Sequence, residues 1–348
     1  MSEIYWLKDL ELALKSANLD SYGVQPVGKP VSLEFYKAWL RDGNHAEMTY
    51  LKDHLESKSD VTSLLKTANS LVSVLIPYTP HPKPRQLPLK ALKVARYARG
   101  EDYHHWFLSQ LQSVADSLQK KYPEEEFLCF SDSKPILEKE WAARNNLGWI
   151  GKNSLLLHPK LGSLFFIGEI VTSLKSENSA GEFNSPDLCG KCTACVESCP
   201  TDAILEDRSL DARKCLAYWN IESKSPAPVE VRKSYEGWIF GCDICQEVCP
   251  WNNKVFQKQQ PKPAPSHEDL IADLKYILTS SNKKLQKDFK GTPVTRAGGK
   301  GLKRSALAIA GGWKLTELKT PIETIDFGNK DLEDMKVWAL NEMATSDT

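Results

Sequence analysis

Apolar residues in the first half of the chain follow two different spacings. Ile4 and the leucines that follow it supply a broad apolar face, which predicts an amphipathic helix. Short unbroken runs of Val, Ile, Leu and Phe predict buried strands. The expected helices span residues 2–18 and 103–121, and the expected strands span residues 71–76, 127–130 and 164–171. The first 175 residues therefore mix helices and strands around one sheet.

A further helix is expected after the second of these strands. Asp132 and Ser133 are residue types that cap helix N-termini, and Pro135 suits a first turn. This helix is expected to run to about Asn146 and to stop at Gly148.

The rest of the chain divides at a linker of Ser, Asn, Gly and Pro over residues 176–187. A cysteine-rich module follows at residues 188–254, and helices are expected from residue 265 to the C-terminus at 348. The pattern predicts an α+β protein of three parts, with residues 1–175, 188–254 and 265–348 as its domains.

The 348 residues have an ordinary composition for a globular protein, and their formal net charge of zero argues against a uniformly basic nucleic-acid binder. No apolar run is long enough to span a bilayer, and no secretory signal is recognisable at the N-terminus. We therefore expect no membrane association and a cytoplasmic location, where cysteines stay reduced.

Charge is nevertheless unevenly distributed. Residues 283–304 carry eight basic side chains against one acid, whereas residues 321–348 carry seven acids against two lysines. A basic stretch is most often a solvated face. This one also contains Gly298, Gly299 and Gly301, which favours an exposed loop that can approach a phosphate backbone.

Eight of the nine cysteines form the most informative pattern in the chain. Two runs end in Cys-Pro, and one cysteine stands between them. The first run is Cys189-x2-Cys192-x2-Cys195-x3-Cys199-Pro200, the second is Cys242-x2-Cys245-x3-Cys249-Pro250, and the isolated residue is Cys215. Two-residue gaps let a tight loop aim successive thiolates at one iron–sulfur cluster, so two [4Fe–4S] clusters are predicted.

In the bacterial pattern the fourth cysteine of a run binds the other cluster. The predicted ligands are therefore Cys189, Cys192, Cys195 and Cys249 for cluster one, and Cys199, Cys215, Cys242 and Cys245 for cluster two. Two structural zinc sites are the alternative, since zinc also takes four cysteines with such gaps. The remaining residue, Cys129, lies in an apolar run and is expected to be buried and inert.

Several longer motifs resemble the epoxyqueuosine reductase family. They are Asp132-Ser133-x-Pro135-x-x-Glu138, Trp141-Ala142-x-Arg144, Leu147-Gly148-Trp149-Ile150-Gly151-Lys152-Asn153, and Phe240-Gly241-Cys242-Asp243-x-Cys245-Gln246. The resemblance covers roughly residues 45–310. It implies a cobalamin- and iron–sulfur-dependent enzyme that reduces the epoxide of epoxyqueuosine to queuosine at the wobble position of tRNA and releases water.

The resemblance also implies cofactor and catalytic roles. The N-terminal part would be a mixed α/β cobalamin-binding domain and the cysteine module would be ferredoxin-like. Asp132 is expected to protonate the leaving oxygen, with its pKa raised by desolvation; a helix cap is its alternative role. The Asp-x-His-x-x-Gly string is absent, so base-off cobalamin without a protein histidine on cobalt is expected. The expected cofactor contacts are Gly151, Lys152, Asn153, Ser154, Gly241 and Asp243.

The implied partners are a tRNA with epoxyqueuosine in its anticodon loop and an external low-potential electron donor, and we expect a monomer. Phosphates are held by cations when single-stranded loops are bound. Lys300, Lys303 and Arg304 of the basic stretch are the candidates for these contacts.

Two other functions remain possible from the sequence. A reductive dehalogenase-like enzyme shares cobalamin and two clusters but acts on small substrates. A ferredoxin-type electron carrier needs only residues 188–254, which leaves most of the chain without a role.

Overall fold

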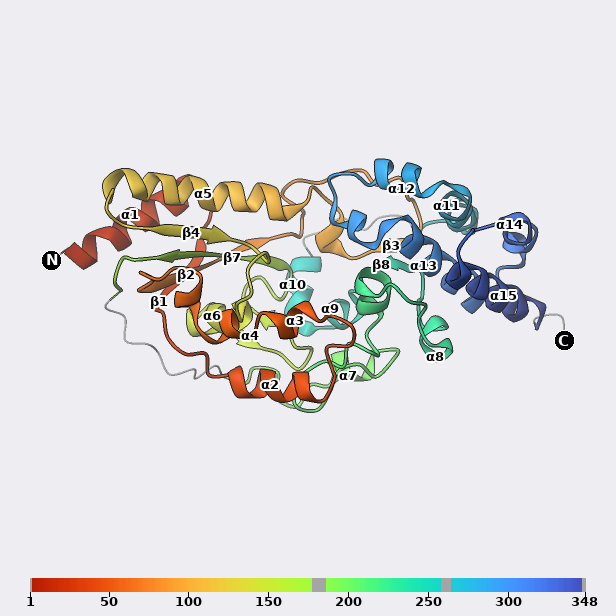
Figure 1. The fold of residues 1–348 in the computed structure, drawn as a ribbon, viewed down its shortest axis with the longest axis horizontal. Coiled ribbons are helices and arrows are strands. Elements are labelled where there is room, and N and C mark those ends of the chain that lie inside the picture. Colours follow the sequence, from red (N-terminus) through yellow and green to blue (C-terminus); the bar gives the residue numbers. More distant parts are fainter. Residues whose placement is uncertain (1, 177–185, 258–263, 346–348) are drawn as a thin grey trace.

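The computed structural model describes residues 2–176, 186–257 and 264–345. Its N-terminal part is built on one antiparallel sheet in the order β1-β2-β7-β4 (Figure 1). Two short pairs, β3 with β8 and β5 with β6, lie outside this sheet. The strands are β1 (Ser21–Pro26), β2 (Ser70–Pro77), β3 (Lys93–Val94), β4 (Phe127–Phe130), β5 (Trp149–Ile150), β6 (Leu156–Leu157), β7 (Phe165–Thr172) and β8 (Trp238–Phe240).

Helices cover both faces of the sheet. On one face α1 and α5 pack on Val72, Val74, Phe166 and Ile170. On the other face α6 packs beneath β2 and β7. The helices before the cysteine module are α1 (Ser2–Ser16), α2 (Leu33–Arg41), α3 (Tyr50–Asp53), α4 (Leu55–Ser59), α5 (Tyr103–Lys121) and α6 (Glu138–Arg144).

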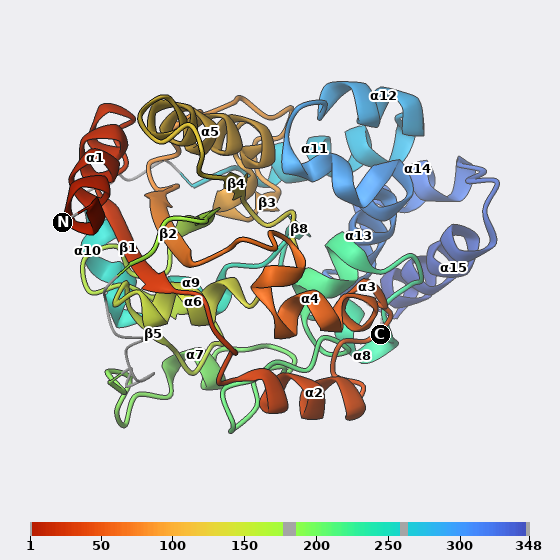
Figure 2. The ribbon, with the colours of Figure 1, turned by 60° about the vertical axis from the view of Figure 1, so that its left-hand side comes forward.

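The cysteine module contains little regular secondary structure and packs against both the N-terminal and the C-terminal parts of the chain. It joins the N-terminal part through α2, where Trp39 Nε1 donates to the carbonyl of Leu210 at 2.7 Å. Figure 2 shows α2 and α7 at the same end of the molecule. The module contains α7 (Ala194–Glu197), the π-helical turn η3 (Tyr218–Glu222), α8 (Val229–Arg232), α9 (Ile244–Glu247) and α10 (Asn253–Phe256).

The C-terminal part is a helical bundle around α13, whose residues Ala306 to Ala310 are almost fully buried. Its core continues into β3 and β8, because Val94, Ile239 and Phe240 belong to the same apolar cluster. The helices are α11 (His267–Thr279), α12 (Asn282–Asp288), α13 (Gly298–Gly312), α14 (Lys319–Thr324) and α15 (Lys330–Ala344).

Most expected elements are present, and two expectations are wrong. No helix starts at Asp132, which has a φ of 53° in a loop, so that α6 begins only at Glu138. The glycines from residue 298 do not form an exposed loop, because they belong to the first turn of α13. A Cβ at Gly299 would meet the backbone of Asn282 at 2.7 Å, so this glycine permits close packing of α12 on α13.

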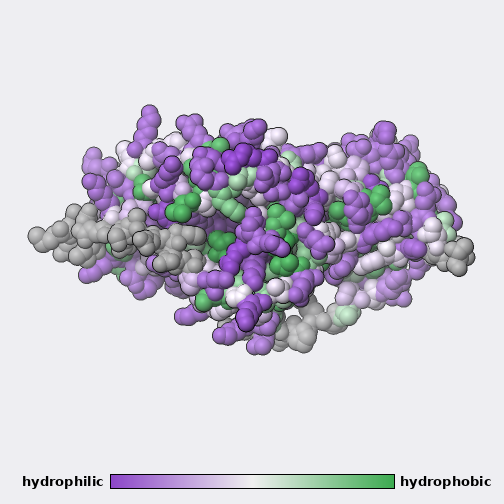
Figure 3. Space-filling model, turned by 90° about the horizontal axis from the view of Figure 1, so that it is seen from below, coloured by the Kyte–Doolittle hydropathy of each residue, from purple (hydrophilic) through white to green (hydrophobic). Residues whose placement is uncertain are grey.

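The surface of the protein is mainly polar. Figure 3 shows hydrophilic residues over most of one face, with hydrophobic side chains reaching the surface near its middle. No helix of the described residues has the length and apolarity that a bilayer span requires. The expected linker at 176–187 lies almost entirely outside the described residues.

Candidate active site

The two cysteine runs meet because α7 and α9 pack against each other. Cys189, Cys192, Cys195 and Cys249 then line one cavity of about 280 Å³, together with Trp251. Burial and the neighbouring thiols of Cys249 and Cys189 raise the pKa of Cys195. These are the four residues predicted to bind cluster one.

The other four cysteines gather deeper in the module. Burial raises the pKa of Cys242 to about 12, and the nearby thiols of Cys215 and Cys199 act in the same direction. Burial also raises the pKa of Cys245, with further contributions from Cys215 and Cys242. The backbone N–H of Ala203 donates to the sulfur of Cys199 at 3.3 Å. The set therefore matches the grouping predicted for cluster two.

A cluster and a single ion place different demands on four sulfurs. A zinc ion needs four sulfurs at ~2.3 Å from one point. Within the described ranges, no three His, Cys, Asp or Glu side chains converge in that way. Each thiolate of a cubane meets a different iron, so its ligands stand farther apart. Metal binding deprotonates thiols, which offsets the raised pKa values of these cysteines.

The segment Gly151–Ser154, expected to hold cobalamin, links cluster one to the rest of the site. Lys152 Nζ donates to the carbonyls of Gly190 and Cys192 at 2.8 and 2.9 Å. The carbonyl of Ser154 accepts from Lys139 Nζ at 2.7 Å. Asn153 is 5% exposed, and its Nδ2 finds no hydrogen-bond partner in the described part of the chain. Asn153 therefore keeps a buried donor for a ligand, whereas Lys152 is already engaged.

Gly241 and Asp243 flank Cys242, which is predicted to bind cluster two. The carboxylate of Asp243 accepts from the backbone N–H of Arg96 at 2.7 Å, and it is 1% exposed. Gly241 has a φ of 66°, and its N–H and C=O are both bonded to the Asn220 side chain at 2.7 and 2.9 Å. Both residues thus fix the cluster-two loop in place.

Asp132 lies at the N-terminal end of α5, although it follows β4. The hydroxyl of Tyr103 donates to its Oδ2 at 2.6 Å, and His104 Nε2 lies 3.5 Å from the same oxygen. The other ring nitrogen of His104 is 2.7 Å from Asp102, which caps α5. The Asp132 side chain is 56% exposed, although the protein packed around it still removes part of its hydration.

The expected rise in the pKa of Asp132 is wrong for this arrangement. Burial raises the pKa, but the hydrogen bonds from His104 and Tyr103 outweigh it, so the pKa falls below its ordinary value. The same contacts act in the opposite sense on the histidine. Hydrogen bonds to Asp102 and Asp132 raise the pKa of His104 to about 9. At neutral pH the pair therefore shares one proton, held mainly on the imidazole.

A second group of ionisable residues surrounds Asp132 and escaped the sequence interpretation. Burial and the charge of Asp132 raise the pKa of Glu138 to about 8. Burial lowers the pKa of Lys139 and of Lys58, a residue 8% exposed under the ring of Tyr36. Perturbed pKa values that cluster in one region of a protein are typical of functional sites.

Arg296 belongs to the basic 283–304 stretch, and its positive charge lowers the pKa of Asp132. Its guanidinium binds Glu222 through two hydrogen bonds of 2.6 and 2.7 Å, and this pairing raises its pKa. Tyr50, 42% exposed, lies beside the pair, and its pKa is raised by burial and by Glu222. No local pattern distinguishes Arg296 from the other basic residues of the stretch, because its neighbours in space come from distant segments.

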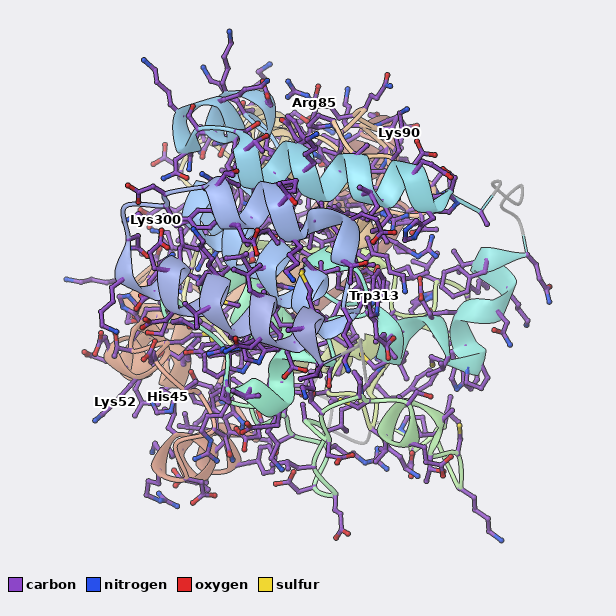
Figure 4. The ribbon with its side chains drawn as sticks, turned by 90° about the vertical axis from the view of Figure 1, so that its right-hand side faces the viewer. His45, Lys52, Arg85, Lys90, Lys300 and Trp313 are labelled. Carbon is purple, nitrogen blue, oxygen red and sulfur yellow. The ribbon has the colours of Figure 1, made fainter. Side chains whose placement is uncertain are left out.

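The three predicted phosphate contacts have different environments. Arg304 is 8% exposed and donates to the carbonyls of Ser223 and Lys224, so it stabilises the bundle and is not free for a phosphate. Lys303 Nζ lies 5.6 Å from the ring of Phe327. Lys300 is exposed, and Figure 4 shows it on the same side of the molecule as Lys52.

Two family models match the chain. One, described as a 4Fe-4S double cluster binding domain, covers residues 188–252, and one described as epoxyqueuosine reductase QueG, DUF1730, covers residues 58–133. An epoxyqueuosine reductase of Cyclobacterium marinum is 38% identical over 270 residues, which are 77% of this chain and 84% of that protein. One from Synechocystis is 34% identical over 292 residues, covering 82% of this chain and 99% of the relative.

Solved structures agree in fold. The epoxyqueuosine reductase of Streptococcus thermophilus superposes with a TM-score of 0.81 at 24% identity, covering 97% of this chain and 90% of that one. An epoxyqueuosine reductase solved with an epoxyqueuosine-modified tRNA-Tyr stem loop gives a TM-score of 0.79, with 98% and 91% covered.

Proposed function

The chain belongs to the epoxyqueuosine reductase family, and from that premise we propose how its own residues reduce epoxyqueuosine in tRNA. The enzyme is an oxidoreductase with two [4Fe–4S] clusters in residues 188–252. We propose that the eight cysteines bind them in the two sets described above. The observation that supports the catalytic role is that Tyr103 and His104 hold the Asp132 carboxylate and keep a proton next to it.

The cofactor proposal rests on the family and on the free donor of Asn153. Cobalamin, bound base-off with no protein histidine on its metal, would supply a strongly reducing centre. The clusters would deliver electrons to it one at a time. Asn153 Nδ2 can donate to a corrin amide, and the turn from Gly151 to Ser154 lies between cluster one and the Asp132 group. Gly241 and Asp243 would hold the loop that faces this cofactor.

The residues of this chain then protonate the oxygen that leaves. Opening the epoxide and expelling water consume two electrons and two protons. Tyr103 orients the Asp132 carboxylate, and the proton shared by Asp132 and His104 passes to the ring oxygen as the C–O bond breaks. A positioned acid contributes roughly 10²–10⁴-fold to the rate. The loss of this acid should therefore slow turnover strongly without changing the clusters.

Asp132→Asn tests this role. The variant should keep its iron content and its affinity for an epoxyqueuosine-containing stem-loop, but its single-turnover rate should fall by roughly 10²–10⁴-fold. Glu56→Gln, which neutralises an exposed carboxylate of α4, is the matched control and should react like the unmodified enzyme. Full activity in Asp132→Asn would refute the assignment.

We further propose that the anticodon loop lies across the edge formed by Tyr50, Arg296 and Lys300. Exposed cations hold phosphates, and an aromatic ring can stack on an unpaired base. Neutralising Lys300 together with Lys52 should weaken binding and reduce the salt dependence of affinity by about one to two phosphate contacts. Lys319→Ala, a substitution at another exposed lysine, should change neither the affinity nor its salt dependence. An unchanged salt dependence of affinity in Lys300→Ala/Lys52→Ala would contradict this placement.

The remaining partners follow from the family and from the chemistry. We propose an external low-potential electron donor, a cytoplasmic location and a monomeric enzyme. A reductive dehalogenase-like activity or a simple electron carrier is not favoured, because the curated relatives are epoxyqueuosine reductases over most of the chain.

A further inference from the structure

Lys152 carries a positive charge that the proposed function leaves without a role. It is one of the expected corrin contacts, but its ammonium group is bonded to the loop of the first cysteine run. Among the described residues that line the cluster-one cavity it is the one cation, and the residues other than cysteine are apolar except for the amide of Asn153. Lys152 is therefore placed to act on cluster one.

The contacts of Lys152 bring its charge close to a predicted cluster ligand. Its Nζ donates to the carbonyl of Gly190 at 2.8 Å and to the carbonyl of Cys192 at 2.9 Å. Gly190 follows the predicted ligand Cys189, and Cys192 is itself a predicted ligand. Because the bonded oxygen and the thiol belong to one residue, Nζ lies within roughly 8 Å of Cys192 Sγ in any rotamer.

The ammonium group of Lys152 has no carboxylate partner in the described part of the chain, and both of its hydrogen bonds go to neutral carbonyls. The carboxylate on the same loop is balanced. Asp187 accepts from the N–H groups of Cys189 and Gly190 at 3.0 and 3.4 Å, and its other oxygen is paired with Arg208 at 2.6 Å. An unpaired cation on a cavity wall is complementary to an anion inside, and a cubane with four thiolate ligands is an anion.

A short hairpin holds Lys152 in this position. Lys152 lies in the turn between β5 and β6, which pair antiparallel. At the start of the hairpin the ring of Trp149 makes a T-shaped contact with the ring of Trp251, with 4.8 Å between the centroids. Trp251 is two residues after the predicted ligand Cys249. The hairpin therefore contacts both cysteine runs, and its paired strands fix the place of the Lys152 charge.

This charge changes how easily cluster one is reduced. Reduction adds a negative charge to a cluster that is already anionic, and the potential depends on net charge, on hydrogen bonds to the sulfurs and on solvent exposure. A nearby cation stabilises the reduced form more than the oxidised form, so it raises the potential. Cys192 is exposed, so solvent screens part of this effect.

We propose that Lys152 is a positioning residue that raises the reduction potential of cluster one and so helps an external donor to reduce it. The inference rests on the proposed function for the assignment of four cysteines to this cluster. The step is the transfer of one electron from the donor to the cluster, in which no bond breaks and no proton moves. Cluster two should keep its potential, because both hydrogen bonds of Lys152 go to the loop of cluster one.

The variant Lys152→Gln removes the charge and keeps an N–H donor. The full-length protein, reconstituted anaerobically with iron and sulfide, would be titrated with a chemical reductant while electron paramagnetic resonance follows both reduced clusters. We expect an unchanged iron content and a fall in one of the two midpoint potentials. The equilibrium constant for reduction of that cluster should decrease roughly tenfold, which corresponds to ~59 mV for one electron.

Two control variants separate the charge from other effects. Lys152→Arg keeps a positive charge and donors for both carbonyls, so its midpoint potentials should match those of the unmodified protein. Lys8→Gln removes the charge of an exposed lysine of α1 and should change neither midpoint. A merely structural role of Lys152 would alter the iron content or the thermal midpoint of unfolding and would leave the potentials in place.

Two unchanged midpoints in Lys152→Gln, or a lowered midpoint in Lys152→Arg, would overturn the inference. If Lys152→Gln lost the iron of cluster one, Lys152→Arg would decide. Full iron content with unchanged midpoints would support the role of the charge, and loss of iron from this variant as well would overturn it. The titration needs neither cobalamin nor RNA, so normal turnover in Asp132→Asn would overturn the proposed acid without affecting this result.

Discussion

Asn220 is the residue whose loss should most specifically release an iron–sulfur cluster without touching a ligand. It is 1% exposed in the π-helical turn η3, which begins three residues after Cys215. Its Oδ1 accepts from the N–H of Gly241 at 2.7 Å, and its Nδ2 donates to the Gly241 carbonyl at 2.9 Å. Gly241 precedes Cys242, so one side chain clamps two ligand segments of cluster two together.

The magnitude follows from these two hydrogen bonds. Asn220→Ala leaves the N–H and the C=O of Gly241 buried and unpaired, and each such group costs about 1–3 kcal/mol. The expected loss in the free energy of unfolding is therefore about 2–6 kcal/mol, a large part of the 5–15 kcal/mol typical of a folded protein. The lost hydrogen bonds belong to the cluster-two loop, so this loop is destabilised most. The cluster should therefore be released before the remainder of the fold unfolds.

The assay is anaerobic iron release to a chelator, followed by cluster absorbance, beside thermal unfolding followed by circular dichroism. Asn69→Ala is the matched control, since Asn69 Nδ2 also donates to two carbonyls but lies directly before β2, far from the cluster cysteines in sequence. Asn220→Ala should release about half of its iron rapidly, and Asn69→Ala should release none early. Equal iron release from the two variants would refute the reasoning.

Two further predictions concern cluster ligation and the Asp132 pair. Cys215→Ser should lose roughly half of the bound iron, whereas Cys129→Ser should keep all of it, as iron and sulfide analysis after reconstitution will show. The pKa of His104 is raised from 6.5 to about 9 on folding, so its charged contact with Asp102 stabilises the protein fully below pH 6.5 and is lost as pH rises through about 9. Asp102→Asn should lower this pKa, measured by proton NMR, and flatten the fall of unfolding free energy across that interval.

The elements with strong patterns were predictable from the sequence. Helix α5 (Tyr103–Lys121) and strand β4 (Phe127–Phe130) occur with the expected bounds. Strand β1 was missed because Gly23 and Pro26 interrupt its pattern. Gly23 is needed there, since a Cβ would meet the carbonyl oxygen of Asn145 at 2.3 Å.

The candidate site was predictable only where its residues are local in the chain. Cysteine spacing indicated the cluster sites directly. The helix expected at Asp132 fails because the backbone there is left-handed, which capping residues alone do not reveal. Arg296 acquires its role from its contact with Glu222, which belongs to a distant segment.

The reduction of the epoxide itself is the most direct test of the central claim. Enzyme reconstituted anaerobically with iron, sulfide and cobalamin would be mixed with an epoxyqueuosine-containing anticodon stem-loop and a chemical reductant, and the nucleosides would be resolved by mass spectrometry. The account predicts a product lighter by one oxygen atom that co-elutes with queuosine. Complete recovery of the epoxide, from protein shown to contain both clusters and bound cobalamin, would contradict it.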